Sequence, residues 1–249
     1  MIGLVGLAGL GFDGALAAEA LAADAQGDAD GALVVRGLPA PVGATRLDPE
    51  RPVWIDDDAT RVFADGEVVL REGVLEMFAC PAGSKEHESV VAIDSPALLL
   101  HVALLRIGAE PGKPVQFEPQ YRAPSGDEIE VAVEWRDESG ARRTARAQDW
   151  VYDTRRERAM DLPFVFGGSG FWTDPETGEQ HYLAEAGDLI CVSNFGAAML
   201  DVPAPSTQAN DGLWYAPYTE RIPPVGTPMR VVLSVAADDA DADIEGEAE

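Results

Sequence analysis

Short runs of alternating apolar and polar residues constrain the fold of this 249-residue chain more than any other feature. The clearest is EIEVAVEW, residues 128–135, where acids occupy most of one face. The other face carries four apolar side chains: Ile129, Val131, Val133 and Trp135. Alternation with a period of two predicts a strand with one buried face. The turn RDESGA follows, and RTARAQDWV then returns as the second strand of a β-hairpin.

Further strands are predicted along the rest of the chain. EVVL (67–70) and VLEMFAC (74–80) form a pair around the turn REG, and SVVAI (89–93) is another β-branched run. PFVFGGSGFW and HYLAEAGDLICVSNF flank the turn TDPETGEQ, which indicates more antiparallel pairing. TPMRVVLSV (227–235) is the last predicted strand.

One segment has the period of a helix. SPALLLHVALLRIG has Ser95 as a predicted N-cap, Pro96 at the first helical position and Gly108 as a stop signal. The residues between them are apolar nearly all round, which is typical of a buried helix. With short strands and no βαβ alternation, the sequence predicts an α+β domain with a mainly antiparallel β-sheet and one buried helix near residues 95–108.

The N-terminus has two interpretations. GLGFDG fits the glycine pattern of a dinucleotide-binding turn, but the βαβ unit that the pattern requires does not follow it. The other interpretation is a secretory signal, because an apolar run over residues 2–12 precedes ALA and AEA, which fit small-residue cleavage sites. No basic residue lies near Met1, as such a signal normally has. We interpret residues 1–25 as a signal peptide and expect export to the periplasm or the extracellular space.

Composition divides the remaining chain. Residues 26–50 are rich in Ala, Asp, Gly and Pro, a composition that predicts a flexible lead-in to the domain. Residues 51–236 form a single predicted domain, and residues 237–249 form an acidic tail that is expected to be disordered. No later run approaches the roughly 18 apolar residues of a membrane span, so the mature chain is expected to have none.

The formal net charge of −26 excludes several classes of partner. Such a surface repels phosphate backbones and anionic lipid headgroups, so no nucleic-acid partner is expected. The charge suits a soluble, salt-adapted protein whose self-repulsion is screened by counterions. The expected partner is an unknown protein or a component of the cell envelope.

The segment CPAGSKEHES, residues 80–89, is the densest in reactive groups. It is either a polar connection whose side chains bond to the backbone or a small pocket for a ligand or a peptide end. In the second case the candidate ligand-binding residues are Lys85, His87, Glu88 and Ser89. No catalytic residue is assigned.

No cofactor is expected, and a divalent metal is the alternative. His87 and Glu88 begin like the zinc-protease motif HExxH, but Val91 replaces the second histidine and the segment resembles a strand. A looser metal site would combine His87 and Glu88 with His101 and His181. His101 lies in the apolar helix, where a histidine held by one internal hydrogen bond is the competing interpretation.

The chain has two cysteines, Cys80 and Cys191. In an exported protein they permit a single disulfide. Both also lie at apolar, strand-like positions, so two separate buried thiols are the other interpretation.

Several stretches of the chain together form a recognisable pattern: DGEVVLREGVLEMFACPAGSKEHESVVAI, ALLRIGAEPGKPVQFEP, IEVAVEW, GDLICVSNFGAAMLD and RIPPVGTPMRVVL. KEHES and IPPVGTP are the most specific parts. Over roughly residues 53–235 these stretches resemble the bacterial YdjY-type domain family. The resemblance implies a family and no mechanism. Some relatives carry iron–sulfur labels, but such clusters usually need four cysteines and this chain has two.

The sequence therefore leaves two functions open. The first is an exported, non-enzymatic module that binds a protein or an envelope component. The second is a small metal-dependent or hydrolytic enzyme centred on KEHES. Polar groups that converge on KEHES from distant segments would favour the enzyme.

Overall fold

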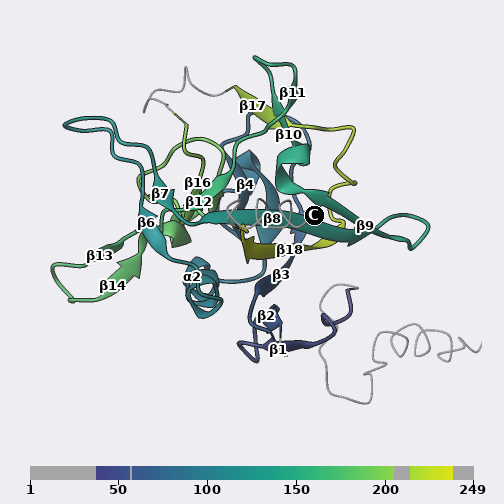
Figure 1. Cartoon of the computed structure of the whole chain (residues 1–249), viewed down its shortest axis with the longest axis horizontal. Helices are drawn as coiled ribbons and strands as arrows, with labels where there is room; N and C mark the ends of the chain where they lie inside the picture. The colour runs from purple at the N-terminus through teal and green to yellow at the C-terminus, as the bar shows by residue number, and fades with distance from the viewer. Residues whose placement is uncertain (1–37, 57, 205–213, 238–249) are drawn as a thin grey trace, which may run out of the picture. The chain divides into compact units, whose positions relative to one another are not determined.

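Eight strands close into a β-barrel in the computed structural model, which describes residues 38–56, 58–204 and 214–237 (Figure 1). The predicted signal peptide and the acidic tail from residue 238 onward lie outside the described residues. Around the barrel the strands are β3 (Arg61–Val68), β18 (Pro228–Val235), β8 (Glu128–Arg136), β12 (Phe164–Phe166), β16 (Leu200–Asp201), β15 (Ile190–Cys191), β4 (Met77–Pro81) and β5 (Ser89–Ile93). The barrel closes because β5 pairs with β3.

The predicted α+β fold with a mainly antiparallel sheet is wrong, because the sheet closes on itself. The expected pairing of residues 67–70 with 74–80 does not form, since β5 lies between β3 and β4. β5 is antiparallel to β3 and parallel to β4, and β15 is parallel to β16. Alternation in the sequence reveals which face of a strand is buried, but it does not reveal which distant strand becomes the neighbour.

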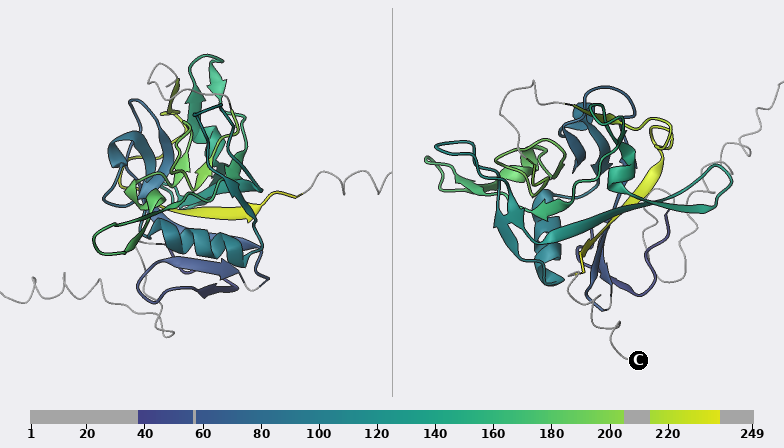
Figure 2. Two further views of the ribbon diagram at one scale, coloured as in Figure 1. Left: turned by 90° about the vertical axis from the view of Figure 1, so that its left-hand side faces the viewer. Right: turned by 45° about the horizontal axis from the view of Figure 1, so that its top comes forward.

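Other strands extend the barrel or form small separate sheets (Figure 2). β9 (Arg142–Arg146) pairs with β8 as the sequence predicts. β1 (Ala44–Arg46) and β2 (Val53–Asp56) add to β3, so part of the expected lead-in is a strand. The small sheets consist of β10 (Val151–Asp153) with β11 (Arg158–Ala159) and β17 (Tyr215–Pro217), β13 (Phe171–Thr173) with β14 (Gln180–Tyr182), and β6 (Pro111–Lys113) with β7 (Ser125–Gly126). The 3-10 helices are η1 (Glu86–Glu88), η2 (Ala147–Trp150) and η3 (Leu183–Ala186).

The core fills the barrel interior. The predicted inward face of β8 is confirmed, because Ile129, Val131 and Val133 are buried and Trp135 packs against the same core. β18 contributes Val231 and Leu233 in the same alternating way. The largest fully buried side chains are aromatic: Trp150, Phe78, Phe164 and Phe166.

The predicted helix is α2 (Ala97–Arg106), and it is buried on one side only. Ala97, Leu100, Ala103 and Leu104 are buried. On the other side are Leu98, Val102 and Leu105, whose exposed fractions are 38%, 49% and 45%. The expectation of a helix buried all round is therefore wrong, because only one face packs on the barrel.

The ends of α2 differ in how well the sequence predicted them. Gly108 has a φ of 88°, the left-handed conformation typical of the residue after a helix. At the other end the cap is Glu185 of η3, which accepts hydrogen bonds from the N–H groups of Ala97 and Leu98 at 3.0 and 2.9 Å. Ser95 does not cap the helix, since its hydroxyl bonds to the carbonyl of Pro96. In the part of the chain that the structure describes, no helix has the length and apolar character needed to cross a membrane.

Candidate functional site

The KEHES segment lies on the connection between β4 and β5. The two strands are parallel, with Met77 opposite Ser89 and Pro81 opposite Ile93. The chain therefore has to run back from the end of β4 to the start of β5, and residues 82–88 make that return. Both ends of the segment are held by barrel strands, which gives its side chains defined positions.

Lys85 is the centre of a group of side chains that we name the Lys85 cluster. Its Nζ lies 2.9 Å from Oδ1 of Asp188 and 3.7 Å from Oε1 of Glu88. The same ammonium lies 4.7 Å from the centroid of the Phe195 ring, within the range of a cation–π interaction. Asp188 and Phe195 flank β15, so charged and aromatic groups from a distant segment do converge on KEHES.

Gly187 makes room for the Lys85 side chain. Its φ is 127°, a conformation that L side chains rarely adopt. A Cβ at this position would lie 2.4 Å from Cγ of Lys85. A side chain at residue 187 would therefore force the Lys85 side chain to move from its position beside Asp188.

Glu76 and Lys85 are two charged residues of the cluster, and both have raised pKa values. Burial raises the pKa of Glu76, and the charge of neighbouring Glu88 raises it further. Burial alone would lower the pKa of Lys85, but the hydrogen bond and charge of Asp188 outweigh burial, so the pKa is raised. Lys85 is thus an ammonium at neutral pH, and an ammonium is a poor nucleophile.

Both cysteines are buried and free, so the structure contains two thiols and no disulfide between them. Burial raises the pKa of Cys80 and raises that of Cys191 well above its usual value. A reactive cysteine needs its thiolate, and burial disfavours the thiolate here. Cys191 packs with Met77 of β4 and Ala198 in a small apolar cluster.

A buried carboxyl group supports the Phe195 side of the cluster. Oδ1 of Asp201 accepts hydrogen bonds from Nδ2 of Asn194 at 3.0 Å and from the N–H of Val202 at 2.8 Å. Its Oδ2 accepts a longer bond of 3.3 Å from the N–H of Phe195. Burial raises the pKa of Asp201 to about 8, although these donors oppose the shift. Asp201 therefore fixes the loop that brings Phe195 to Lys85.

His87 and Ser89 do not form a nucleophile–base pair. The His87 side chain is 78% exposed, and its Nε2 lies 3.9 Å from Oε2 of Glu88. Ser89 is buried and donates its hydroxyl hydrogen to the carbonyl oxygen of Lys85 at 2.7 Å. The Ser89 hydroxyl is thus used to shape the connection.

The other candidate metal ligands lie elsewhere. Nδ1 of His101 lies 2.8 Å from the hydroxyl of Tyr182, and burial lowers the pKa of His101. His181 stacks on Trp172 in the β13–β14 hairpin, with ring centroids 5.5 Å apart. Among the described residues, no three His, Cys, Asp or Glu side chains are grouped so that they would hold a metal ion.

Replacement of Glu88 by Gln is expected to change the free energy of unfolding by less than about 1 kcal/mol. The variant loses the 3.7 Å attraction to Lys85 but also removes a like charge beside Glu76, and the two effects oppose each other. Urea unfolding measures the change, and Glu72→Gln at an exposed site is the matched control. A loss of several kcal/mol would show that Glu88 is essential to the cluster. Stoichiometric metal in the wild type that is lost in Glu88→Gln would favour the metal-enzyme alternative.

Several residues of the cluster were not singled out from the sequence. They are Glu76, Gly187, Asp188, Phe195 and Asp201. The available signal was the stretch GDLICVSNFGAAMLD, which places Gly-Asp directly before an apolar strand and a second Asp directly after one.

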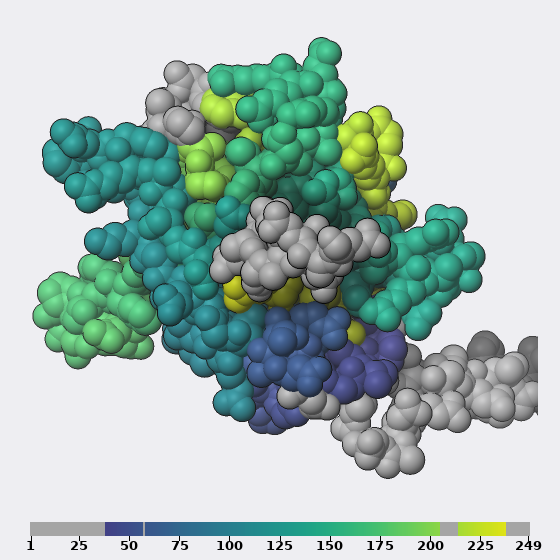
Figure 3. Space-filling model, viewed as in Figure 1, coloured from purple at the N-terminus to yellow at the C-terminus, as the bar shows by residue number. Residues whose placement is uncertain are grey.

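A second candidate surface is apolar and lies on α2 and the neighbouring hairpin. We name it the helix–hairpin surface. Tyr182 joins its two parts, because its ring contacts both His101 of α2 and Phe171 of β13. In Figure 3 the β13–β14 hairpin stands out from the body at the left. The large apolar side chains exposed on this surface are Leu98, Val102, Leu105, Phe171, Trp172 and Leu183.

The comparisons with known proteins identify a family. The family model described as the YdjY domain matches residues 53–234. No curated protein and no solved structure matches the chain. The match covers all eight barrel strands except the last residue of β18, and it includes the whole Lys85 cluster. The chain therefore belongs to the YdjY domain family.

Proposed function

We propose that this protein is an exported binding module whose YdjY domain contacts a partner protein through the helix–hairpin surface. The supporting observation is the group of large apolar side chains that α2 and the hairpin leave in solvent. Exposed apolar patches of this kind are typical of interaction sites. The export part of the proposal rests on the apolar N-terminal run and the small-residue motifs after it.

The charge of the surface indicates the chemistry of the partner. The turn of the β13–β14 hairpin carries Asp174, Glu176 and Glu179, and Glu185 lies at the start of α2. Protein interfaces commonly have an apolar centre with aromatic side chains and a polar rim. The matching partner has an apolar patch bordered by Lys and Arg, which the acidic surface attracts over long range.

The geometry of the Lys85 cluster favours a structural role in such a module over a catalytic role. Lys85 is held as a cation between Asp188 and Glu88, and the buried thiols are protonated. The hydroxyls of Ser84 and Ser89 donate hydrogen bonds to the backbone carbonyls of Pro81 and Lys85. The enzyme alternative draws its support from the convergence of acids on Lys85 and is tested by the metal measurement on Glu88→Gln.

Replacement of an exposed apolar residue on the helix–hairpin surface is expected to weaken partner binding about tenfold or more. A photo-crosslinking amino acid at Val102 in the exported protein identifies the contacting protein, and the purified partner is then titrated against the wild type. Leu105→Ser and Trp172→Ser remove apolar area from the surface, and both side chains are exposed, so folding is expected to persist.

Val225→Ser is the matched control, since Val225 is exposed but lies on the loop before β18. Its affinity is expected to equal that of the wild type. Binding is also expected to weaken as the salt concentration rises, because salt screens the acidic rim. Equal affinities for the wild type, Leu105→Ser and Trp172→Ser would refute the proposed surface.

A further inference from the structure

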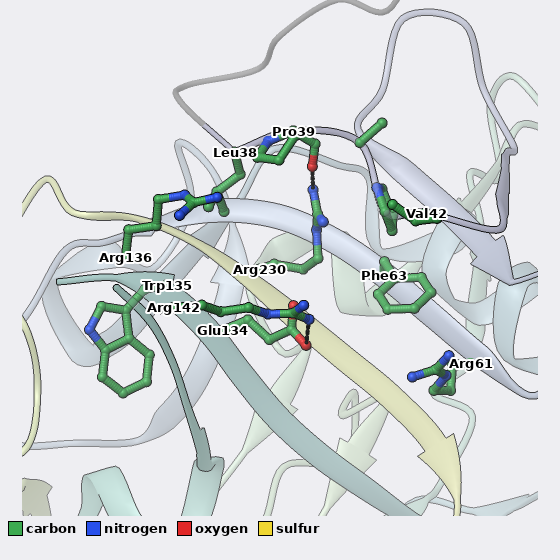
Figure 4. A pocket seen from close by; sticks show the side chains of 12 residues that line it. Leu38, Pro39, Val42, Arg61, Phe63, Glu134, Trp135, Arg136, Arg142 and Arg230 are labelled. Carbon is green, nitrogen blue, oxygen red and sulfur yellow. Dashed lines mark hydrogen bonds and ion pairs between the residues drawn. The ribbon is translucent and has the colours of Figure 1, made fainter. Parts of the chain in front are cut away.

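A pocket of about 290 Å³ lies on the outer face of the barrel, away from KEHES (Figure 4). Its floor comes from β3, β8, β9 and β18, and the segment 38–42 covers it. Four of the chain's 18 basic residues line it: Arg61, Arg136, Arg142 and Arg230. One carboxylate, that of Glu134, also lines it. A chain with a net charge of −26 thus gathers positive charge at this pocket.

Three of the four guanidinium groups have carboxylate partners. Arg142 pairs with Glu134 at 2.6 Å, and Arg61 pairs with Asp56 at 2.9 Å. The Arg142 and Arg61 side chains remain more than half exposed, so each keeps donors that face solvent.

The third pair fixes the pocket itself. Nε and Nη2 of Arg230 bond to the two carboxylate oxygens of Asp65 at 2.5 and 2.9 Å. Nη2 also donates to the carbonyl of Pro39 at 3.0 Å, as the dashed line in Figure 4 shows. This arginine therefore ties the covering segment to the barrel strand beneath it.

Arg136 is the arginine without a carboxylate partner among the described residues. Its Nη1 donates to the carbonyl of Gly140 at 2.8 Å, and its guanidinium points toward Leu38 and Pro39 in Figure 4. The pocket therefore has one more cation than its immediate carboxylates balance. Phe63 adds an apolar wall beside these donors.

We propose that this pocket binds a small molecule or segment through a phosphate or carboxylate group, with Arg136 as its main ligand. A guanidinium presents two parallel N–H donors that match the oxygens of either group. Arg61 and Arg142 supply further donors, and the Phe63 ring offers an apolar contact for the remainder of the ligand. The site is separate from the helix–hairpin surface and does not depend on it.

The chain itself is a second source of the same chemistry. Ser234 lies opposite Arg61 in the pairing of β18 with β3, so the last strand ends beside the pocket. Residues 238–249 follow, and they contain seven carboxylate side chains. The experiment has to distinguish this segment from an anion in solution.

The probe is inorganic phosphate, titrated calorimetrically into the full chain at constant ionic strength. The wild type is expected to bind one phosphate, and Arg136→Gln is expected to bind it about tenfold more weakly or worse, because one charge-assisted contact is lost. Arg106→Gln is the matched control, since it removes an exposed arginine of α2 and is expected to leave the affinity unchanged. Circular dichroism checks that each variant is folded.

A further variant distinguishes an anion in solution from the acidic segment 238–249 as the source of the bound group. In this variant Asp238, Asp239, Asp241 and Asp243 are replaced by Asn. Equal phosphate binding by this chain and the wild type assigns the pocket to an anion in solution. Binding that appears or strengthens only in the Asn-substituted chain assigns the pocket to the acidic segment. Absence of phosphate binding in both chains, or an affinity of Arg136→Gln equal to that of the wild type, overturns the proposal.

Discussion

Replacement of Asp201 by alanine is expected to lower the free energy of unfolding by about 3 kcal/mol or more. The side chain is fully buried and accepts hydrogen bonds from Asn194, Val202 and Phe195. Alanine leaves the N–H groups of Val202 and Phe195 without these acceptors and opens a cavity at the end of β16. Urea unfolding measures the loss, and Glu176→Ala on the exposed hairpin turn is a matched control with an expected change near zero.

The same residue is expected to make stability depend on pH. Burial raises the pKa of Asp201 from 3.8 to about 8, so the folded protein binds this proton more tightly than the unfolded chain. The contribution is complete below about pH 4 and is lost as the pH rises through 8. Relative to Asp201→Asn, which does not titrate, the wild type is expected to lose at least about 2 kcal/mol between pH 5 and pH 9.

Other groups titrate in both proteins, so their contributions cancel in the comparison. Parallel pH profiles for the wild type and Asp201→Asn would show that the carboxyl group stays ionised throughout. A stability of Asp201→Ala equal to that of the wild type would show that the loop around Phe195 does not need the carboxyl group.

Replacement of Asp65 by Asn is expected to cost about 3–5 kcal/mol, because it leaves the buried Arg230 guanidinium without its counter-charge. The two side chains are only 4% and 7% exposed and lie directly opposite each other on β3 and β18. Burial raises the pKa of Asp65, while its bond to Arg230 opposes that shift. Chemical denaturation of the wild type and the variant measures the loss.

The double variant Asp65→Leu with Arg230→Met separates the charge from the packing. Removal of both charges avoids an unpaired buried ion, so the double variant is expected to be more stable than Asp65→Asn. Arg61→Gln, which breaks the more exposed pair with Asp56, is the control and is expected to cost no more than about 1 kcal/mol. A double variant less stable than Asp65→Asn would show that Arg230 contributes mainly through its bond to Pro39 and its position over Trp54.

Local features of the fold were readable from the sequence. The alternation at residues 128–135 predicted the inward face of β8, and the turn RDESGA predicted its pairing with β9. The strands at 89–93 and 227–235, the hairpin around TDPETGEQ and the helix near 95–108 also appear in the structure. These features depend on side-chain periodicity and turn residues, which act between neighbours in the chain. The family resemblance through KEHES and IPPVGTP was likewise confirmed.

Long-range pairing was not readable in the same way. Closure of the barrel depends on β5 lying between β3 and β4, and no local pattern specifies that order. The exposure of Val102 also depends on which side of α2 meets the barrel, since the helix is apolar nearly all round. An apolar face is more stable when it is buried, but which apolar face of an element becomes buried depends on the elements that pack against it.

The sequence by itself determined the acidic character of the protein, its family, its main strands and the segment where reactive groups are densest. Only the tertiary structure decided what those groups do. It placed Asp188 and Phe195 around Lys85, left His87 in solvent, and gathered four arginines from separate strands at one pocket. The physical reason is that charge and hydrogen-bond interactions act over a few ångströms. Lys85 and Asp188 are 103 residues apart in the chain and Asp65 and Arg230 are 165 apart, so such partners meet only when the barrel closes.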